Sequence, residues 1–119
     1  MLAVHAARSG APLGDRVRVA DTWWTRLRGL LGTTSLAEGD GLLIEPCRGV
    51  HMLGMKYPID VAFLDRAGRV VGLCHRLAPG RRSPVVRAAR SALELPAGTL
   101  AAAGIVEGDT LTLSPRETP

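Results

Sequence analysis

Residues 58–76 read PIDVAFLDRAGRVVGLCHR, and this stretch does most to decide the fold. Its two apolar segments, 59–65 and 70–76, have the composition of β-strands. Between them stand Arg, Ala and Gly, and Gly68 can adopt the left-handed backbone conformation that a tight turn requires. The stretch therefore predicts a β-hairpin.

The hairpin also predicts which residues face each other across the two strands. If the chain turns at the Arg-Ala-Gly sequence, Leu64 lies opposite Val70 and Asp60 lies opposite Cys74. A slip of one residue would instead place His75 opposite Asp60. Either register brings Asp60 close to Cys74 and His75.

Other short segments follow the same pattern on both sides of the hairpin. Further strands are predicted at 16–20, 41–46, 91–96 and 110–114, short helices at 22–31 and 98–104, and a turn-rich connector at 9–14. The strands outnumber the helices and do not alternate with long helices, which argues against a parallel doubly wound sheet. The sequence predicts a mainly β, single-domain antiparallel sandwich or barrel-like fold with one or two short helices. The 119 residues fit one domain that covers 1–119.

The number and placement of charged residues limit the classes of binding partner. The formal net charge is +4 and Lys56 is the one lysine, so the positive charge is almost all arginine. Arginine binds phosphate well, but the basic residues are scattered apart from the run at 81–90, and no aromatic residue interleaves with that run. The pattern argues against nucleic acid as the partner and leaves a small ligand or a protein.

The compartment is also predicted. The N-terminal residues 1–15 contain no unbroken apolar run of signal-peptide length, and no segment has the length and apolarity of a transmembrane helix. We therefore expect a cytoplasmic protein, in which Cys47 and Cys74 are free thiols.

Three residues with soft or metal-binding side chains are spaced four apart, namely Cys47, His51 and Met55. A turn in this segment could bring the thiol, the imidazole and the thioether together, a set that suits copper(I), and Cys with His suits zinc. No paired Cys-x-x-Cys or His-x-x-x-His supports such a site, and cysteine and methionine often simply fill core space. The sequence requires no cofactor.

Asp60 interrupts the apolar run that begins the hairpin. A buried carboxylate costs several kcal/mol unless it is paired or hydrogen-bonded. The favoured interpretation is that Asp60 accepts hydrogen bonds from nearby backbone amides, as aspartate often does. The alternative is a carboxylate that orients a histidine or acts as a general base.

Aromatic side chains are scarce, and each is therefore expected to fill a large part of the core; they are Trp23, Trp24, Tyr57 and Phe63. We expect both tryptophan rings to lie beneath a loop. In the alternative, a tryptophan stays exposed beside Arg26 and Arg28 and offers a contact surface for a partner or ligand.

Several motifs, in this order and spacing, resemble one known family. They are RLRGLLG (26–32), EGDGLLIEPC (38–47), VHMLGMKYPIDVAFLD (50–65), GRVV (68–71) and LELPAG (93–98). The chain is similar over residues 15–114 to the family called domain of unknown function, number 192. Met52 stands where threonine is expected and Lys56 where arginine is common, and lysine does not make the bidentate anion contact of arginine. The resemblance implies a compact, mainly β fold and no particular reaction.

The hypothesis that follows is a small ligand-binding or accessory module. Its predicted pocket is lined by Cys47, His51, Met55, Asp60 and the helix that carries Trp23, with Arg26 or Lys56 at the rim, which favours an anionic group on the ligand. One alternative is a hydrolase that uses Cys47 or a metal held by Cys47, His51 and Met55. The other is a protein–protein interaction module that docks through an exposed apolar or arginine patch.

Overall fold

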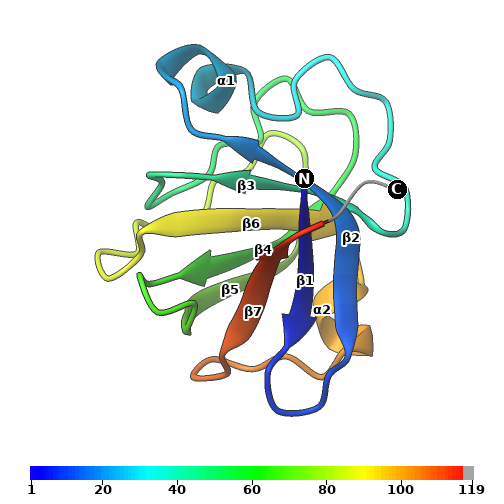
Figure 1. The fold of residues 1–119 in the computed structure, drawn as a ribbon. Coiled ribbons are helices and arrows are strands. Elements are labelled where there is room, and N and C mark those ends of the chain that lie inside the picture. Colours follow the sequence, from blue (N-terminus) through cyan, green and yellow to red (C-terminus); the bar gives the residue numbers. More distant parts are fainter. Residues whose placement is uncertain (117–119) are drawn as a thin grey trace.

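Seven strands form one continuous curled sheet in the computed structural model, which describes residues 1–116 (Figure 1). The strands are β1 (Leu2–Ala6), β2 (Pro12–Ala20), β3 (Asp40–Ile44), β4 (Ile59–Leu64), β5 (Val70–Leu77), β6 (Ser91–Pro96) and β7 (Leu111–Pro115), and the helices are α1 (Trp23–Arg28) and α2 (Thr99–Ala102). Their order across the sheet is β5-β4-β6-β3-β2-β1-β7. The mainly β prediction is confirmed, and every predicted strand is present. The sequence analysis does not predict β1, and β2 begins inside the predicted 9–14 connector.

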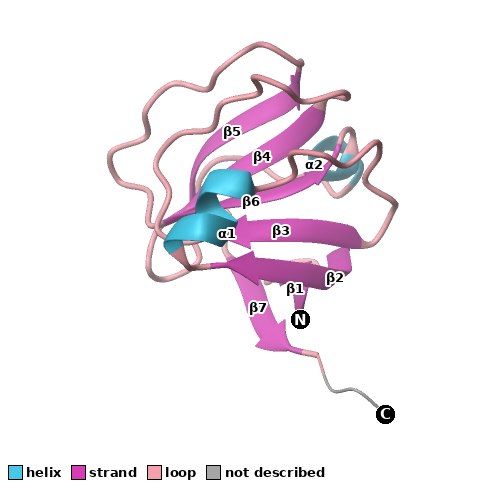
Figure 2. Cartoon of the chain, turned by 90° about the horizontal axis from the view of Figure 1, so that it is seen from above, coloured by secondary structure: helices cyan, strands magenta, loops and turns pink. Residues whose placement is uncertain are grey.

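The sheet is a half-barrel, so the sandwich alternative is wrong and the barrel-like one describes the fold better. The sheet is also mixed, because β2 and β3 pair in parallel while all other pairs are antiparallel. Two parallel neighbours need a long crossover between them, since the chain must return to the starting edge. Residues 21–39 make that crossover and carry α1, which sits above β3 (Figures 1 and 2).

The hairpin of β4 and β5 forms as predicted, and Leu64 pairs with Val70. The predicted pairing of Asp60 with Cys74 is wrong, because the register shifts between Phe63 and Leu64 and Val61 becomes the partner of Cys74. The extra residue in a β-bulge displaces all pairing beyond it by one position. The shift leaves Asp60 opposite a second irregularity of β5.

Alternation along the central strands separates two core clusters, one on each face of the sheet. In β6, Leu93 and Leu95 belong to one cluster and Ala92 to the other. Glu94 therefore points to the same face as Ala92, where the core includes Val61 and Phe63. This is the face that α1 and the segment between β3 and β4 cover.

The aromatic residues depart from expectation. Phe63 is fully buried and Tyr57 is half-buried, but Trp23 and Trp24 are 72% and 62% exposed. The expectation that both tryptophan rings lie beneath a loop is wrong, because no residue of α1 is buried. The helix also ends earlier than predicted, at Arg28, since Gly29 has a positive φ of 50° and stops it.

Candidate functional site

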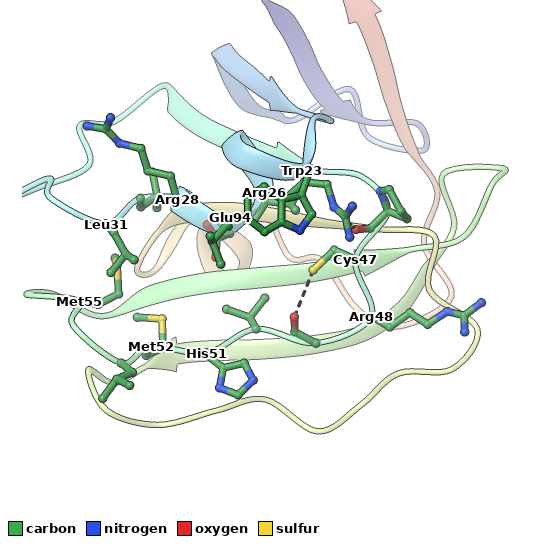
Figure 3. Close-up of a pocket in the computed structure, with 18 residues that line it drawn as sticks. Trp23, Arg26, Arg28, Leu31, Cys47, Arg48, His51, Met52, Met55 and Glu94 are labelled. Atoms are coloured by element: carbon green, nitrogen blue, oxygen red, sulfur yellow. Dashed lines mark hydrogen bonds between the residues drawn. The ribbon is translucent and has the colours of Figure 1, made fainter.

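A hollow of about 490 Å³ lies between α1, the segment 46–55 and the sheet (Figure 3). Residues of α1 and the turn after it line one side, and the segment 46–55 lines the other. Ile44 at the end of β3 and Glu94 in the middle of β6 also line it. A cavity of this size suits a small organic ligand.

Backbone hydrogen bonds fix the segment that forms the far wall. Val50 exchanges bonds with Ser83, whose Oγ accepts from the Val50 amide at 2.8 Å and whose amide donates to the Val50 carbonyl at 2.9 Å. The Met52 amide donates to the Arg81 carbonyl at 2.8 Å, and the Cys47 amide donates to the Arg90 carbonyl at 3.0 Å. These bonds tie an otherwise irregular segment to the 81–90 stretch and position its side chains.

Glu94 is the buried charged residue of the hollow. It is 4% exposed, and within residues 1–116 its carboxylate makes no hydrogen bond or ion pair. No fully sealed side-chain oxygen in this part of the chain lacks a partner, so the carboxyl group keeps a small opening to the hollow. Burial without a partner disfavours the charged form, and it raises the pKa of Glu94 to about 7. The carboxyl group can therefore exchange a proton near neutral pH. Figure 3 shows its side chain inside the hollow, close to α1.

Cys47 belongs to the wall segment 46–55 and lines the same hollow as Glu94. Its Sγ donates to the carbonyl of Gly49 at 3.1 Å, a contact drawn as a dashed line in Figure 3. Burial raises the pKa of Cys47, the charge of Glu94 raises it further, and the charge of Arg26 lowers it. The group is therefore a protonated thiol at neutral pH.

We expect Cys47 to react with iodoacetamide at pH 7 more slowly than free cysteine does, because only the thiolate is nucleophilic. The Cys74→Ala variant isolates this reaction, since Cys74 is the second free cysteine and burial raises its pKa too. A rate faster than that of free cysteine would contradict the account.

Arg26 brings a positive charge to the mouth of the hollow. Its Nε donates to the carbonyl of Pro46 at 3.1 Å, which links α1 to the wall segment. Arg26 and Glu94 line the same hollow but form no ion pair with each other. The terminal nitrogens of the guanidinium group make no hydrogen bond within the described residues.

The rest of the mouth is apolar and exposed. Trp23, Leu27, Leu31 and Leu53 all line the hollow, with exposed fractions of 72%, 60%, 40% and 79%. Trp24 contacts the ring of Trp23 but does not line the hollow. Such a contiguous group of exposed apolar side chains is typical of a binding surface.

The structure brings most of the predicted site residues to this hollow. Trp23, Arg26, Cys47, His51 and Met55 line it, together with the fully buried Met52. His51 lies at the edge, and in Figure 3 its ring points away from Cys47 and Glu94. No group of three or more His, Cys, Asp or Glu residues within 1–116 could hold a metal ion.

Two predicted residues do not line the hollow. Lys56 is exposed and lies outside it. Asp60 points to the other face of the sheet, because it pairs with Leu95 while Glu94 pairs with Val61. Cys47 and His51 therefore line the hollow as predicted, but the carboxylate of Asp60 does not.

Asp60 instead holds three backbone amides. Its Oδ1 accepts from the Arg76 amide at 2.9 Å, and its Oδ2 accepts from the amides of Gly98 at 3.1 Å and Leu100 at 2.9 Å. Arg76 has a positive φ of 51°, an uncommon conformation that the bond to Asp60 helps to fix. These contacts match the favoured interpretation of Asp60 as an acceptor of amide hydrogen bonds.

Glu94, the most buried ionisable group of the hollow, is not among the site residues predicted from the sequence. The signal is the same one that marks Asp60, namely a single acidic residue inside an apolar strand, SALELP. Asp60 in β4 pairs with Leu95 and Glu94 in β6 pairs with Val61, so this register places the two acids on opposite faces of the sheet, and only the fold tells which face has the hollow.

Residues 4–113 match the family model DUF192, described as Uncharacterized ACR, COG1430. The search of curated proteins finds no match. Within residues 1–116, no helix has the length and apolar character needed to cross a membrane.

Two crystal structures share the fold. A protein of unknown function from Novosphingobium aromaticivorans is 22% identical, with a TM-score of 0.76 over 93% of this chain and 82% of that one. A "putative transcription regulator" from Sinorhizobium meliloti is 26% identical, with a TM-score of 0.77 over 94% of this chain and 91% of that one.

Proposed function

The chain belongs to the DUF192 family of uncharacterised proteins, and from that premise we propose that it is a small-molecule-binding module whose ligand occupies the hollow above Glu94. The observation that carries the proposal is the unpartnered carboxyl group of Glu94 at the floor of a cavity of ligand size. A fold that buries an ionisable group without a partner loses stability, and a bound ligand that offers the missing partner recovers it.

The exposed mouth supports the same proposal. The side chains of Trp23, Leu27 and Leu53 line the hollow, so a ligand that enters would cover part of their apolar surface. A protein partner that covered these side chains without entering the hollow would leave Glu94 without a partner. We therefore assign the exposed group to ligand entry and not to a separate interaction module.

The hydrolase alternative receives less support from the site. A cysteine nucleophile needs a lowered pKa, whereas burial raises the pKa of Cys47. His51, the histidine that lines the hollow with Cys47, points away from it (Figure 3). We place the module in the cytoplasm, where Cys47 and Cys74 would stay reduced as the structure has them.

The neighbouring tryptophans supply a matched test of ligand binding. We expect some members of a chemically diverse panel of small organic molecules to raise the melting temperature of the protein. For these compounds Trp23→Ala should weaken binding by about tenfold, since an aromatic contact contributes roughly 1 kcal/mol or more. Trp24→Ala should leave binding unchanged, because Trp24 is similarly exposed but does not line the hollow.

Isothermal titration calorimetry measures the affinity of each stabilising compound for the two variants. A panel without a single binder would contradict the proposal, and so would equal losses in the two variants.

A further inference from the structure

We propose that the ligand is a small zwitterion whose ammonium group meets Glu94 at the floor of the hollow and whose anionic group meets Arg26 at its mouth. This inference rests on the proposed function and names the class of ligand that the same hollow takes. It starts from one juxtaposition: a buried acid and an exposed base line one cavity and are not paired with each other.

The floor offers an acceptor that a cation would satisfy. Glu94 shares the hollow with several apolar and thioether side chains, including the fully buried Met52 and the buried Leu30. In so apolar a site a carboxylate gains most from a group that both donates a hydrogen bond and neutralises its charge, and an ammonium group does both. A carboxylate or phosphate at this position would meet like charge.

The mouth has the opposite charge. Arg26 is held by its bond to the Pro46 carbonyl, which leaves its two terminal nitrogens for an anion. Arg28 and Arg48 also line the hollow, although in Figure 3 their guanidinium groups extend outward. Glu94 is the one acidic residue among the described residues that line the hollow, so no exposed carboxylate competes for the arginines.

The two charged groups share one small cavity with Cys47. Arg26, Cys47 and Glu94 all line the same hollow of about 490 Å³. A compact ligand that lies across Cys47 can therefore reach the acid with one end and the base with the other. The apolar side chains of Trp23 and Leu27 would cover its hydrocarbon part.

The experiment compares ligands that differ only in their charged ends. The zwitterions are β-alanine, 4-aminobutyrate, 5-aminopentanoate and 4-(aminomethyl)benzoate. Each is paired with the amine that lacks the carboxylate and the acid that lacks the amine. At about pH 8, at least one zwitterion should bind about tenfold more tightly than either partner, as each lost ionic contact weakens affinity by that order.

Substitutions then assign each end of the ligand. Glu94→Gln should abolish the advantage of the zwitterion over the acid, and Arg26→Gln should abolish its advantage over the amine. Arg18→Gln is the matched control, because Arg18 is exposed on β2 and does not line the hollow. That variant should bind like the wild-type protein.

The pH dependence gives a readout that a purely structural role of Glu94 would not produce. An ammonium group selects the ionised carboxylate, so affinity should rise about tenfold from pH 6 to pH 8, following the pKa of Glu94. The other titratable or charged groups that line the hollow are Arg26, Arg28, Cys47, Arg48 and His51. The His51→Gln variant should keep the rise and Glu94→Gln should lose it.

The outcomes separate this inference from the proposed function. If other molecules bind in a Trp23-dependent manner and the zwitterions do not, the ligand class is wrong and the binding function stands. Equal binding of a zwitterion and its acid partner would also overturn the ligand class. If neither the diverse panel nor the zwitterions bind, both proposals fail.

Discussion

Replacing Asp60 with alanine is expected to lower the free energy of unfolding by about 3–5 kcal/mol, the usual loss when one side of a buried charged network is removed. The carboxylate is fully buried and accepts from three amides, of Arg76, Gly98 and Leu100. Alanine would leave all three donors without this partner, and it would release the positive-φ backbone of Arg76. Urea unfolding at pH 7 measures the loss.

Asp65 supplies the matched control. Its Oδ1 also accepts from two backbone amides, those of Ala67 and Arg69, but in an exposed hairpin turn. Water can replace those bonds, so Asp65→Ala should cost only about 1 kcal/mol. A similar loss in the two variants would show that Asp60 does not fix the junction of β5 and α2.

Replacing Glu94 with glutamine is expected to remove a large pH dependence of stability. The pKa of Glu94 is about 7 in the folded protein and 4.5 in its ordinary state, so the folded state binds more protons between these values. Stability must therefore fall as pH rises from 4.5 to about 7, and the penalty is complete above pH 7. At 1.36 kcal/mol per pKa unit, the ionised carboxyl costs about 3 kcal/mol.

The difference in unfolding free energy between wild type and Glu94→Gln isolates the contribution of the Glu94 carboxyl group. We expect Glu94→Gln and wild type to differ in unfolding free energy by a nearly constant amount below pH 4.5. From there to pH 8 the variant should gain about 3 kcal/mol relative to wild type, because glutamine cannot ionise. The exposed Glu107→Gln is the control and should show no such gain. A difference that stays constant across this range would contradict the burial of Glu94.

Much of the fold could be predicted from local patterns. The hairpin at 58–76 and the strand at 91–96 follow from composition and turn residues, which act over short distances along the chain. The parallel pairing of β2 with β3 could not be predicted, since it depends on how the 21–39 crossover packs. The half-barrel curl follows from that packing and from bulges, which leave no simple signal in the sequence.

The candidate site was predictable only in part, for a related reason. The segment with Cys47, His51 and Met55 stands out because it gathers soft and polar side chains. The role of Asp60 depends on amides from residues 76, 98 and 100, which only the tertiary fold brings together. Glu94 lines the hollow because side chains of β6 alternate between the two faces of the sheet. A shift of one position would have placed it on the other face, with Leu93 and Leu95.

The tryptophans are residues for which the local sequence pattern predicts burial and the structure shows exposure. The apolar spacing of residues 22–31 is typical of a helix that packs on a core, but Gly29 ends α1 after six residues. Leu30, just beyond the helix, is the residue that becomes buried. The rings of Trp23 and Trp24 therefore stay exposed, and that of Trp23 lies at the mouth of the hollow.

Both proposals depend on an unpartnered, ionisable carboxyl group at the floor of the hollow. Titration of the Glu94 side-chain carboxyl by ¹³C NMR, assigned by its loss in Glu94→Gln, measures this property. We expect a midpoint near pH 7, which falls when a ligand that carries an ammonium group binds. A midpoint near 4.5 in the free protein would mean that Glu94 is solvated or already partnered, and the proposed site would lose its basis.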